Sequence, residues 1–364
     1  MSTKFVIRGN RPLYGEIAVS GMKNAALPIL FATILTGDVC TLENIPAVSD
    51  ITNSLLLIQQ MGAQVKYLNP TTVLINTAGV RQGTSPDELV RKMRGSSYLL
   101  GAELGRFGKT RIAWPGGCDF GGSRPLDQHI KGFRALGAKT DTEGGYIYAE
   151  ADEGLKGSSV YFDVASVGAT VNVILASVFA EGTTVIENAA REPHIVDLAN
   201  FLNACGANIV GAGTSVIKVH GVEELHGCNY TIIPDMIEAG TYMTAVAATG
   251  GEVNIRNVIP KHLEIISKKL IEMGKKVKVV LGFNTKDEVF YENEFRALGA
   301  DVSVTTVDGS YGTKGFVTDV MKDMDYTYFY TCGPEPMLKA IYKTSVTSGQ
   351  FSFEERMGCG FGAC

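Results

Sequence analysis

The chain has 364 residues, of which 45% are hydrophobic and 20% charged, and its net charge is −5. These values are ordinary for a globular protein of two or three domains, and the negative balance gives no reason to expect nucleic acid as a partner. No apolar run reaches the roughly 18 residues of a membrane span, and the amino terminus lacks the apolar core of a signal peptide. Seven scattered cysteines suit reduced thiols, so the composition predicts a cytoplasmic protein that does not enter a membrane.

A pattern of small-residue helix, glycine turn and short β-prone run occurs three times. The copies are FATILTGDVCTLENIP, ASVFAEGTTVIENAA and AVAATGGEVNIRNVIP, and each holds an asparagine after the run: Asn44, Asn188 and Asn257. A helix-like segment that ends in glycine follows each copy. Gly-Ala pairs that end such segments fall at residues 63, 138 and 207, so the period is about 70 residues, which is typical of a repeated supersecondary unit. Strands alternating with helices predict an α/β fold whose helices are covered by sheets.

The composition changes after residue 274, and no linker marks the change. Residues 275–364 hold 14 aromatic side chains, against 17 in the 274 residues before them. Strands are expected over residues 277–283, 301–308 and 326–333, and helices over 286–298, 314–324 and 335–345. Such regular alternation predicts a fragment of a parallel sheet.

A glycine-rich loop, WPGGCDFGGSRPLD at residues 114–127, holds Cys118 and, six residues later, Arg124. Cationic neighbours favour the reactive thiolate form of a cysteine, and such a side chain acts as a nucleophile or a general acid. A free cysteine is equally often a small buried apolar residue. The residues alone leave both interpretations open.

Three further segments are candidates for anion or ligand contacts. SGMKNAALPILFA places Lys23 and Asn24 at an expected helix start, where backbone N–H groups attract anions. RKMRGSS carries Arg94 among three cations, and DVASVGAT is a turn of small residues that includes Ser166 and Val167. The alternative for the first two is a solvated surface, and for the third it is close helix packing.

Taken in order, these motifs resemble the enolpyruvyl transferases that act on UDP-N-acetylglucosamine. SGMKNAALPIL, PGGCDFGGSRPLDQHIKGF, SVGATVN, EGTTVIENAAREPHIVDLANFL and PDMIEAGT match that family over residues 1 to about 274. The resemblance implies inside-out α/β domains of three repeats each, with no cofactor or metal. It also implies transfer of the enolpyruvyl group of phosphoenolpyruvate to the 3-hydroxyl of UDP-N-acetylglucosamine, with release of phosphate, in peptidoglycan precursor synthesis.

The same resemblance implies roles for individual residues. Cys118 matches the acid that protonates the methylene carbon of phosphoenolpyruvate, and Lys23, Asn24 and Arg124 match contacts to that substrate. The matches to contacts with the nucleotide sugar are Arg94, Arg124, Pro125, Leu126, Asp127, Gln128, Ser166 and Val167. The chain departs from the family at Met22, Val164 and Met236, and its cysteine loop is one residue longer.

The resemblance also divides the chain. It implies a complete first domain over residues 22–229 and a truncated second domain formed by residues 1–21 and 230–274. The second domain holds one repeat of three and lacks the segment that carries the general base. We therefore expect open apolar faces after residue 230 and impaired turnover.

Residues 275–364 resemble the nicotinamide-binding half of ferredoxin-reductase-type proteins, in particular the electron-transfer subunit of dihydroorotate dehydrogenase. Cys359 and Cys364 have the C-x4-C spacing that opens a [2Fe–2S] ligand set. Two of the four ligands and the flavin-binding barrel are missing, so FAD, NAD and the cluster are expected only as remnants, and free thiols are the alternative. An electron-transfer fragment, or a chimera that only binds UDP-N-acetylglucosamine, is the alternative function.

Overall fold

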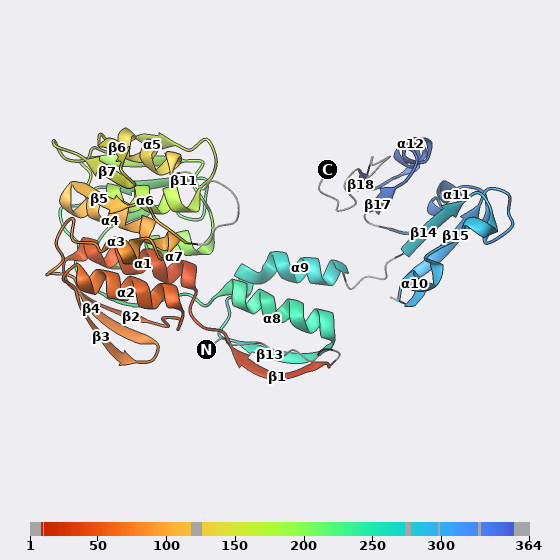
Figure 1. Ribbon diagram of the computed structural model, residues 1–364, viewed down its shortest axis with the longest axis horizontal. Coiled ribbons are helices and arrows are strands. Elements are labelled where there is room, and N and C mark those ends of the chain that lie inside the picture. Colours follow the sequence, from red (N-terminus) through yellow and green to blue (C-terminus); the bar gives the residue numbers. More distant parts are fainter. Residues whose placement is uncertain are drawn as a thin grey trace. The chain divides into compact units, whose positions relative to one another are not determined.

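The computed structural model describes residues 9, 11–117, 126–273, 278–297, 299–326 and 329–352. The chain forms two compact units, Met1–Ile265 and Ile266–Cys364 (Figure 1). Among the described residues, no helix is long and apolar enough to span a membrane.

The first unit contains three copies of one arrangement, in the order helix, strand, helix, strand, strand. The first copy is α1 (Lys23–Thr36), β2 (Val39–Glu43), α2 (Ser49–Gln60), β3 (Gln64–Asn69) and β4 (Thr72–Asn76). The second is α4 (Tyr98–Phe107), β5 (Lys109–Ala113), α5 (Asp127–Ala135), β6 (Lys139–Glu143) and β7 (Tyr146–Glu150). The third is α6 (Val167–Ser177), β9 (Thr183–Glu187), α7 (Pro193–Ala204), β10 (Asn208–Val210) and β11 (Val216–His220). The predicted α/β repeat is confirmed.

Each copy contributes one small sheet. The described strands are ordered β12-β2-β4-β3, β5-β7-β6 and β8-β9-β11-β10, with β8 at Ser159–Tyr161 and β12 at Asn229–Thr231. The pairs β12–β2 and β8–β9 are parallel, whereas the hairpin strands pair antiparallel. Two short helices, α3 (Asp87–Val90) and η1 (Arg94–Ser97), connect the first copy to the second.

The central helices α1, α4 and α6 pack against one another in the core (Figure 1). A Cβ atom at Gly101 of α4 would lie 2.4 Å from the backbone oxygen of Asn172, and one at Gly105 would lie 2.5 Å from that of Leu175. Against α1, a Cβ atom at Gly95 would lie 3.0 Å from Leu27 Cδ1, and one at Gly105 would lie 3.1 Å from Leu35 Cδ2. In each pair of helices, later residues of one helix contact later residues of the other. The helices α1, α4 and α6 therefore run parallel. The sequence supplies glycine where the backbones touch and apolar side chains elsewhere.

One carboxyl group, that of Glu103 in α4, is fully buried in this core. It accepts hydrogen bonds from Thr110 Oγ1 at 2.7 Å and from the Gly83 amide at 3.3 Å. Burial, only partly offset by these donors, raises the pKa of Glu103 from 4.5 to about 7. At a pH between 4.5 and about 7, Glu103 keeps its proton in the folded protein but has lost it in the unfolded chain.

We therefore expect the free energy of unfolding to fall as pH rises from about 4.5 to about 7, by about 3 kcal/mol from this group. The measurement is urea unfolding at steps of pH for the wild type and for Glu103→Gln. The difference between the two proteins isolates Glu103 from other titrating groups. A difference that does not change across this range of pH would show that the carboxyl group is not protonated in the fold.

The three repeated asparagines adopt one backbone conformation; Asn44 and Asn188 belong to the first and third copies, and Asn257 lies beyond the three. Asn44, Asn188 and Asn257 have φ angles of 57°, 55° and 55°, in the left-handed region. Their side-chain amides donate to the backbone oxygens of Ile232, Phe162 and Val19 at 2.9, 2.9 and 2.7 Å. Each of these backbone oxygens belongs to the residue that directly follows a strand. That strand pairs in parallel with the strand that precedes the asparagine. Asparagine serves here because it tolerates this conformation and carries a donor.

Asn188→Ala is expected to lower the free energy of unfolding by about 2 kcal/mol, and Asn188→Gly by about 1 kcal/mol. Alanine loses the hydrogen bond and adds left-handed strain, whereas glycine loses only the bond. Urea unfolding measures both, with Asn229→Ala on the exposed strand β12 as the control. Equal losses of unfolding free energy in the two Asn188 variants would show that alanine is not strained in the left-handed conformation.

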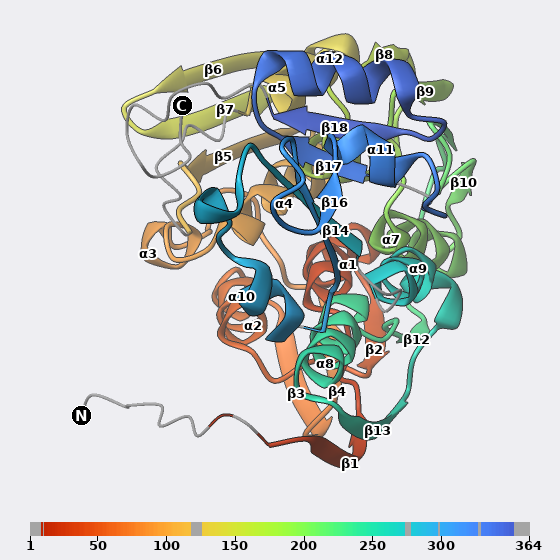
Figure 2. The same cartoon turned by 90° about the vertical axis from the view of Figure 1, so that its right-hand side faces the viewer.

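A fourth copy begins with α8 (Met236–Thr249) and β13 (Gly251–Arg256), followed by η2 (Pro260–Leu263) and α9 (Glu264–Met273). Strand β13 pairs in parallel with β1 (Leu13–Ala18), as Figure 2 shows, and no third described strand joins them. Only Ala239 and Gly240 of α8 are buried, although this helix is as apolar as α1. The expected open apolar face is therefore found on α8.

The second unit alternates strands and helices, but its described strands form two sheets and not the single fragment that the sequence predicted. One sheet holds β14 (Lys278–Phe283), β15 (Asp301–Thr306) and β16 (Thr313–Lys314), all parallel. The other holds β17 (Phe329–Cys332) and β18 (Gly349–Ser352). The helices are η3 (Lys286–Glu288), α10 (Glu292–Ala297), α11 (Val317–Met321) and α12 (Glu335–Thr344). The helix expected over 286–298 is interrupted because Tyr291 has a φ of 65°.

Candidate active site

The candidate site residues gather at helix amino termini. Lys23 is the first residue of α1, Arg94 begins η1, which leads into α4, and Val167 begins α6. Because these helices run parallel in one core, their amino termini lie at the same end of it. Unpaired backbone N–H groups and the helix dipoles make such an end attractive to anions.

Lys23 and Asn24 occupy the first turn of α1, as the sequence predicted. The Lys23 ammonium lies 3.0 Å from Asp50 Oδ2, and 44% of its side chain is exposed. The ion pair holds the ammonium at the helix start while leaving it accessible to an anion. Met22, which precedes it, is fully buried, and its amide donates to the Ile233 oxygen at 2.8 Å.

The glycines before Cys118 allow the loop to leave the core. A Cβ atom at Gly116 would lie 1.7 Å from the Arg91 oxygen, and one at Gly117 would lie 2.9 Å from the Arg94 nitrogen. Gly117 also has a φ of 111°, so both positions require glycine. The described part of the loop therefore ends against Arg94. Cys118, Arg124 and Pro125 lie outside the described residues, and so do Cys359 and Cys364.

Arg94 is half-buried, and its charge acts on two neighbouring side chains. Burial raises the pKa of Tyr98 to about 12, and the Arg94 charge opposes that rise. Burial, and next the same charge, lower the pKa of His129 to about 4. Arg94 thus lies among the residues at the amino termini of α4 and α5.

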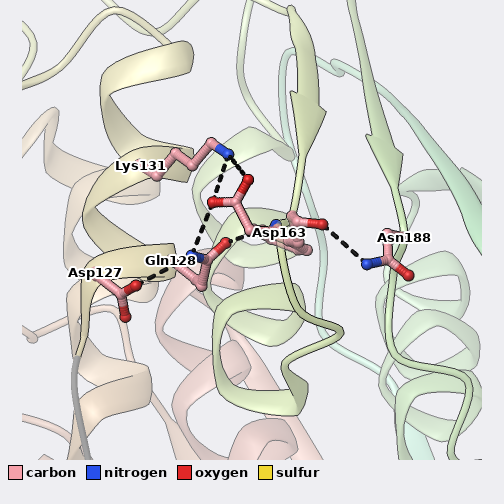
Figure 3. Close-up of polar contacts among 6 residues, drawn as sticks. Asp127, Gln128, Lys131, Asp163 and Asn188 are labelled. Carbon is pink, nitrogen blue, oxygen red and sulfur yellow. Dashed lines mark hydrogen bonds and ion pairs between the residues drawn. The ribbon is translucent and has the colours of Figure 1, made fainter.

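The segment that re-enters the described structure at Leu126 is anchored firmly. Leu126 is buried, while Asp127 and Gln128 begin α5 and remain accessible. Gln128 Nε2 donates to Asp163 Oδ2 at 3.2 Å, and Gln128 Oε1 accepts from the Asp163 amide at 3.1 Å. Lys131 also binds both oxygens of Asp163 at 2.8 Å (Figure 3). These contacts join the start of α5 to the turn before α6.

The turn before α6 carries Ser166 and Val167. Ser166 caps the helix, because its hydroxyl accepts from the Ala169 amide at 3.3 Å. The structure therefore brings Leu126–Gln128 and Ser166–Val167 together, although about 40 residues separate them in sequence.

His129 is a residue of this site that the sequence analysis missed. It is 5% exposed, its Nδ1 lies 2.8 Å from Asn172 Nδ2, and a Cβ atom at Gly168 would lie 2.9 Å from its Nε2. With its pKa lowered to about 4, the ring is neutral near pH 7 and accepts the Asn172 hydrogen at Nδ1. Asn172 Oδ1 also accepts from the Gly101 amide at 2.7 Å. The only signal in the sequence was a histidine directly after PLDQ.

Among the residues that the structure describes, no three His, Cys, Asp or Glu side chains form a group able to hold a metal ion. The site can thus present helix termini, Lys23 and Arg94 to anionic ligands.

Comparisons with known proteins agree with this fold. A family model described as EPSP synthase (3-phosphoshikimate 1-carboxyvinyltransferase) matches residues 7–321. A UDP-N-acetylglucosamine 1-carboxyvinyltransferase of Clostridium botulinum is 49% identical over 323 residues, which cover 88% of this chain and 74% of the relative. Another, UDP-N-acetylglucosamine 1-carboxyvinyltransferase 3 of Caldanaerobacter subterraneus subsp. tengcongensis, is 52% identical over 271 residues, 74% of this chain and 64% of that relative.

Among solved structures, the enolpyruvyl transferase NikO of Streptomyces tendae superposes with a TM-score of 0.65 at 22% identity, over 80% of this chain and 73% of that one. The family match continues to residue 321, past the boundary near residue 274 that the sequence suggested. The chain spans about three quarters of the Clostridium relative. With its repeated α/β units and these matches, the chain belongs to the enolpyruvyl transferase family.

Proposed function

We propose that the protein transfers the enolpyruvyl group of phosphoenolpyruvate to the 3-hydroxyl of UDP-N-acetylglucosamine and releases phosphate. Relatives that share about half of its residues are named for this activity. The observation that carries the proposal is the convergence of three helix amino termini with Lys23 and Arg94 at one end of the core. Both substrates carry phosphate groups, which such an end binds.

The proposed chemistry proceeds by addition and elimination. The Cys118 thiol gives a proton to the methylene carbon of phosphoenolpyruvate, and positive character develops at C2. The sugar 3-hydroxyl adds to C2 and loses its proton to a base. Loss of phosphate and of a methyl proton then restores the double bond. Lys23 and Arg124 hold the phosphate as its charge shifts, and Asn24 orients it.

The nucleotide sugar is proposed to lie along the junction of α5 and α6. Leu126, Asp127 and Gln128 would follow the uridine, together with Pro125 and Arg124. Arg94 would meet the phosphates, and Ser166 and Val167 would offer backbone groups. The hydrogen bonds between Gln128 and Asp163 support this assignment, because they keep the two segments in contact.

For the domain organisation we propose that residues 22–229 form the first domain and that residues 1–21 and 230–274 begin the second. The exposed apolar side chains of α8 support an incomplete second domain.

For residues 275–364 we propose a remnant of a ferredoxin-reductase-like domain. The parallel pair β14–β15, with α10 between its strands in sequence, supports this origin. We expect the purified protein to be colourless. Flavin or iron–sulfur absorbance would favour the electron-transfer function instead.

Phosphate release from phosphoenolpyruvate in the presence of UDP-N-acetylglucosamine tests the proposed activity. The wild type is expected to release phosphate only when both substrates are present, and Cys118→Ala is expected to release none. Cys332→Ala is the matched control, because Cys332 is exposed in the second unit. Nucleotide-sugar binding without release from the wild type would overturn the transferase in favour of a chimera that only binds.

A further inference from the structure

Three cysteines that the proposed reaction does not use meet inside the first unit. Cys40 lies in β2, Cys205 follows the last residue of α7, and Cys228 directly precedes β12. The sulfur atoms of Cys205 and Cys228 are 3.3 Å apart, and Cys40 lies beside Cys228 because β2 pairs with β12. Cys40 and Cys205 are buried, whereas Cys228 is partly exposed. The cluster therefore has one member that a small oxidant reaches first.

The arrangement is more specific than apolar packing requires. A disulfide bond of about 2.05 Å needs the Cys205 and Cys228 sulfurs to approach by only about 1.2 Å. Thiolates are the reactive species in thiol–disulfide chemistry, and Cys228 is the thiol of this pair that is partly exposed. Among the described residues, no three His, Cys, Asp or Glu side chains form a group that could hold a metal ion.

We propose that Cys205 and Cys228 form a site of reversible oxidation by peroxide. The Cys228 sulfur attacks the O–O bond of hydrogen peroxide, becomes a sulfenic acid and releases one water. The Cys205 thiol then attacks the sulfenic sulfur, forms the S–S bond and releases the second water. Two thiols are oxidised and one peroxide is reduced to two waters. A small thiol reverses the step by exchange.

A disulfide bond between Cys205 and Cys228 would restrain β12, the strand that leads to the candidate active site. The Cys228 oxygen accepts from the Thr41 amide at 2.9 Å, and β12 then pairs with β2. Two residues beyond β12, the Ile233 oxygen accepts from the Met22 amide, next to Lys23. Only a short segment therefore separates Cys228 from the start of α1. The oxidation itself is independent of the proposed transferase activity, whereas its effect on substrate binding rests on that function.

The test is peptide mapping of the full chain after treatment with hydrogen peroxide, digested without reductant. The expected product is a peptide pair joined through Cys205 and Cys228 that disappears when dithiothreitol is added. Cys228→Ser should abolish this link, and Cys40→Ser and Cys332→Ser should retain it. Mapping is used in place of activity because oxidation of Cys118 would by itself abolish the proposed transfer. Absence of the link, or links dominated by Cys40, would overturn the proposal.

Wild-type protein alone supplies a second readout, which guards against variants that fail to fold. Hydrogen exchange of the Met22 and Ile232 amides is expected to slow after oxidation and to recover after reduction. Unchanged exchange in protein that carries the link would refute the effect on the strand. Loss of transferase activity in every sample, with the link still present, would count against the proposed function and not against the oxidation site.

Discussion

Replacing Lys23 by alanine is expected to lower kcat/KM for phosphoenolpyruvate by about 100- to 1,000-fold. The change removes a full charge from the first turn of α1, where the helix amide groups and Asn24 would remain. Stability should change by less than about 1 kcal/mol, because the lost ion pair with Asp50 is partly exposed. The measurement is phosphate release at varied phosphoenolpyruvate with saturating UDP-N-acetylglucosamine.

Two variants control this experiment. Lys139→Ala removes a lysine that is also ion-paired, with Asp152 at 2.7 Å, but on the exposed strand β6. It should leave kcat/KM unchanged. Lys23→Arg keeps the charge and should retain part of the activity. A Lys23→Ala protein with wild-type kinetics would remove Lys23 from the proposed site.

Replacing Asn172 by leucine is expected to lower the free energy of unfolding by about 3 kcal/mol. The side chain bonds the Gly101 amide, His129 Nδ1 and the Gly168 oxygen, at 2.7, 2.8 and 3.3 Å. Leucine leaves the Gly101 amide and His129 Nδ1 without this partner in the core. Affinity for UDP-N-acetylglucosamine should also fall, because Asn172 joins the amino-terminal parts of α4, α5 and α6.

The matched control is Asn203→Leu. Asn203 bonds both backbone groups of Ile209, at 2.9 and 2.8 Å, between α7 and β10. This variant should lose stability but keep its affinity for the nucleotide sugar, measured by calorimetry. Equal affinity losses in the two variants would mean that Asn172 acts only through general stability and does not position the site.

Much of the fold could be predicted because its signals are local. The asparagines at 44, 188 and 257 marked the repeat because each adopts the same left-handed turn. The helix start at Lys23 was readable for the same reason, since a cap or first turn depends on a few neighbouring residues. The family resemblance added the site residues at those positions, and the comparisons support the family across residues 7–321.

Other features could not be predicted, and two expectations were wrong. The helix expected over 286–298 was interrupted at Tyr291, whose left-handed conformation no propensity favours. The strands of the second unit divided between two sheets, because pairing depends on partners that are distant in sequence. His129 was missed because its importance comes from Asn172 and Gly168, which lie on another helix.

The sequence by itself determined the repeat, the turn at each asparagine, the glycines of the cysteine loop and the residue types of the site. The tertiary structure alone decided that α1, α4 and α6 run parallel, so that Lys23, Arg94 and Ser166 share one end of the core. It also decided that Cys40, Cys205 and Cys228 meet. The physical reason is that turns and caps depend on near neighbours, whereas these groupings depend on packing between segments far apart in the chain.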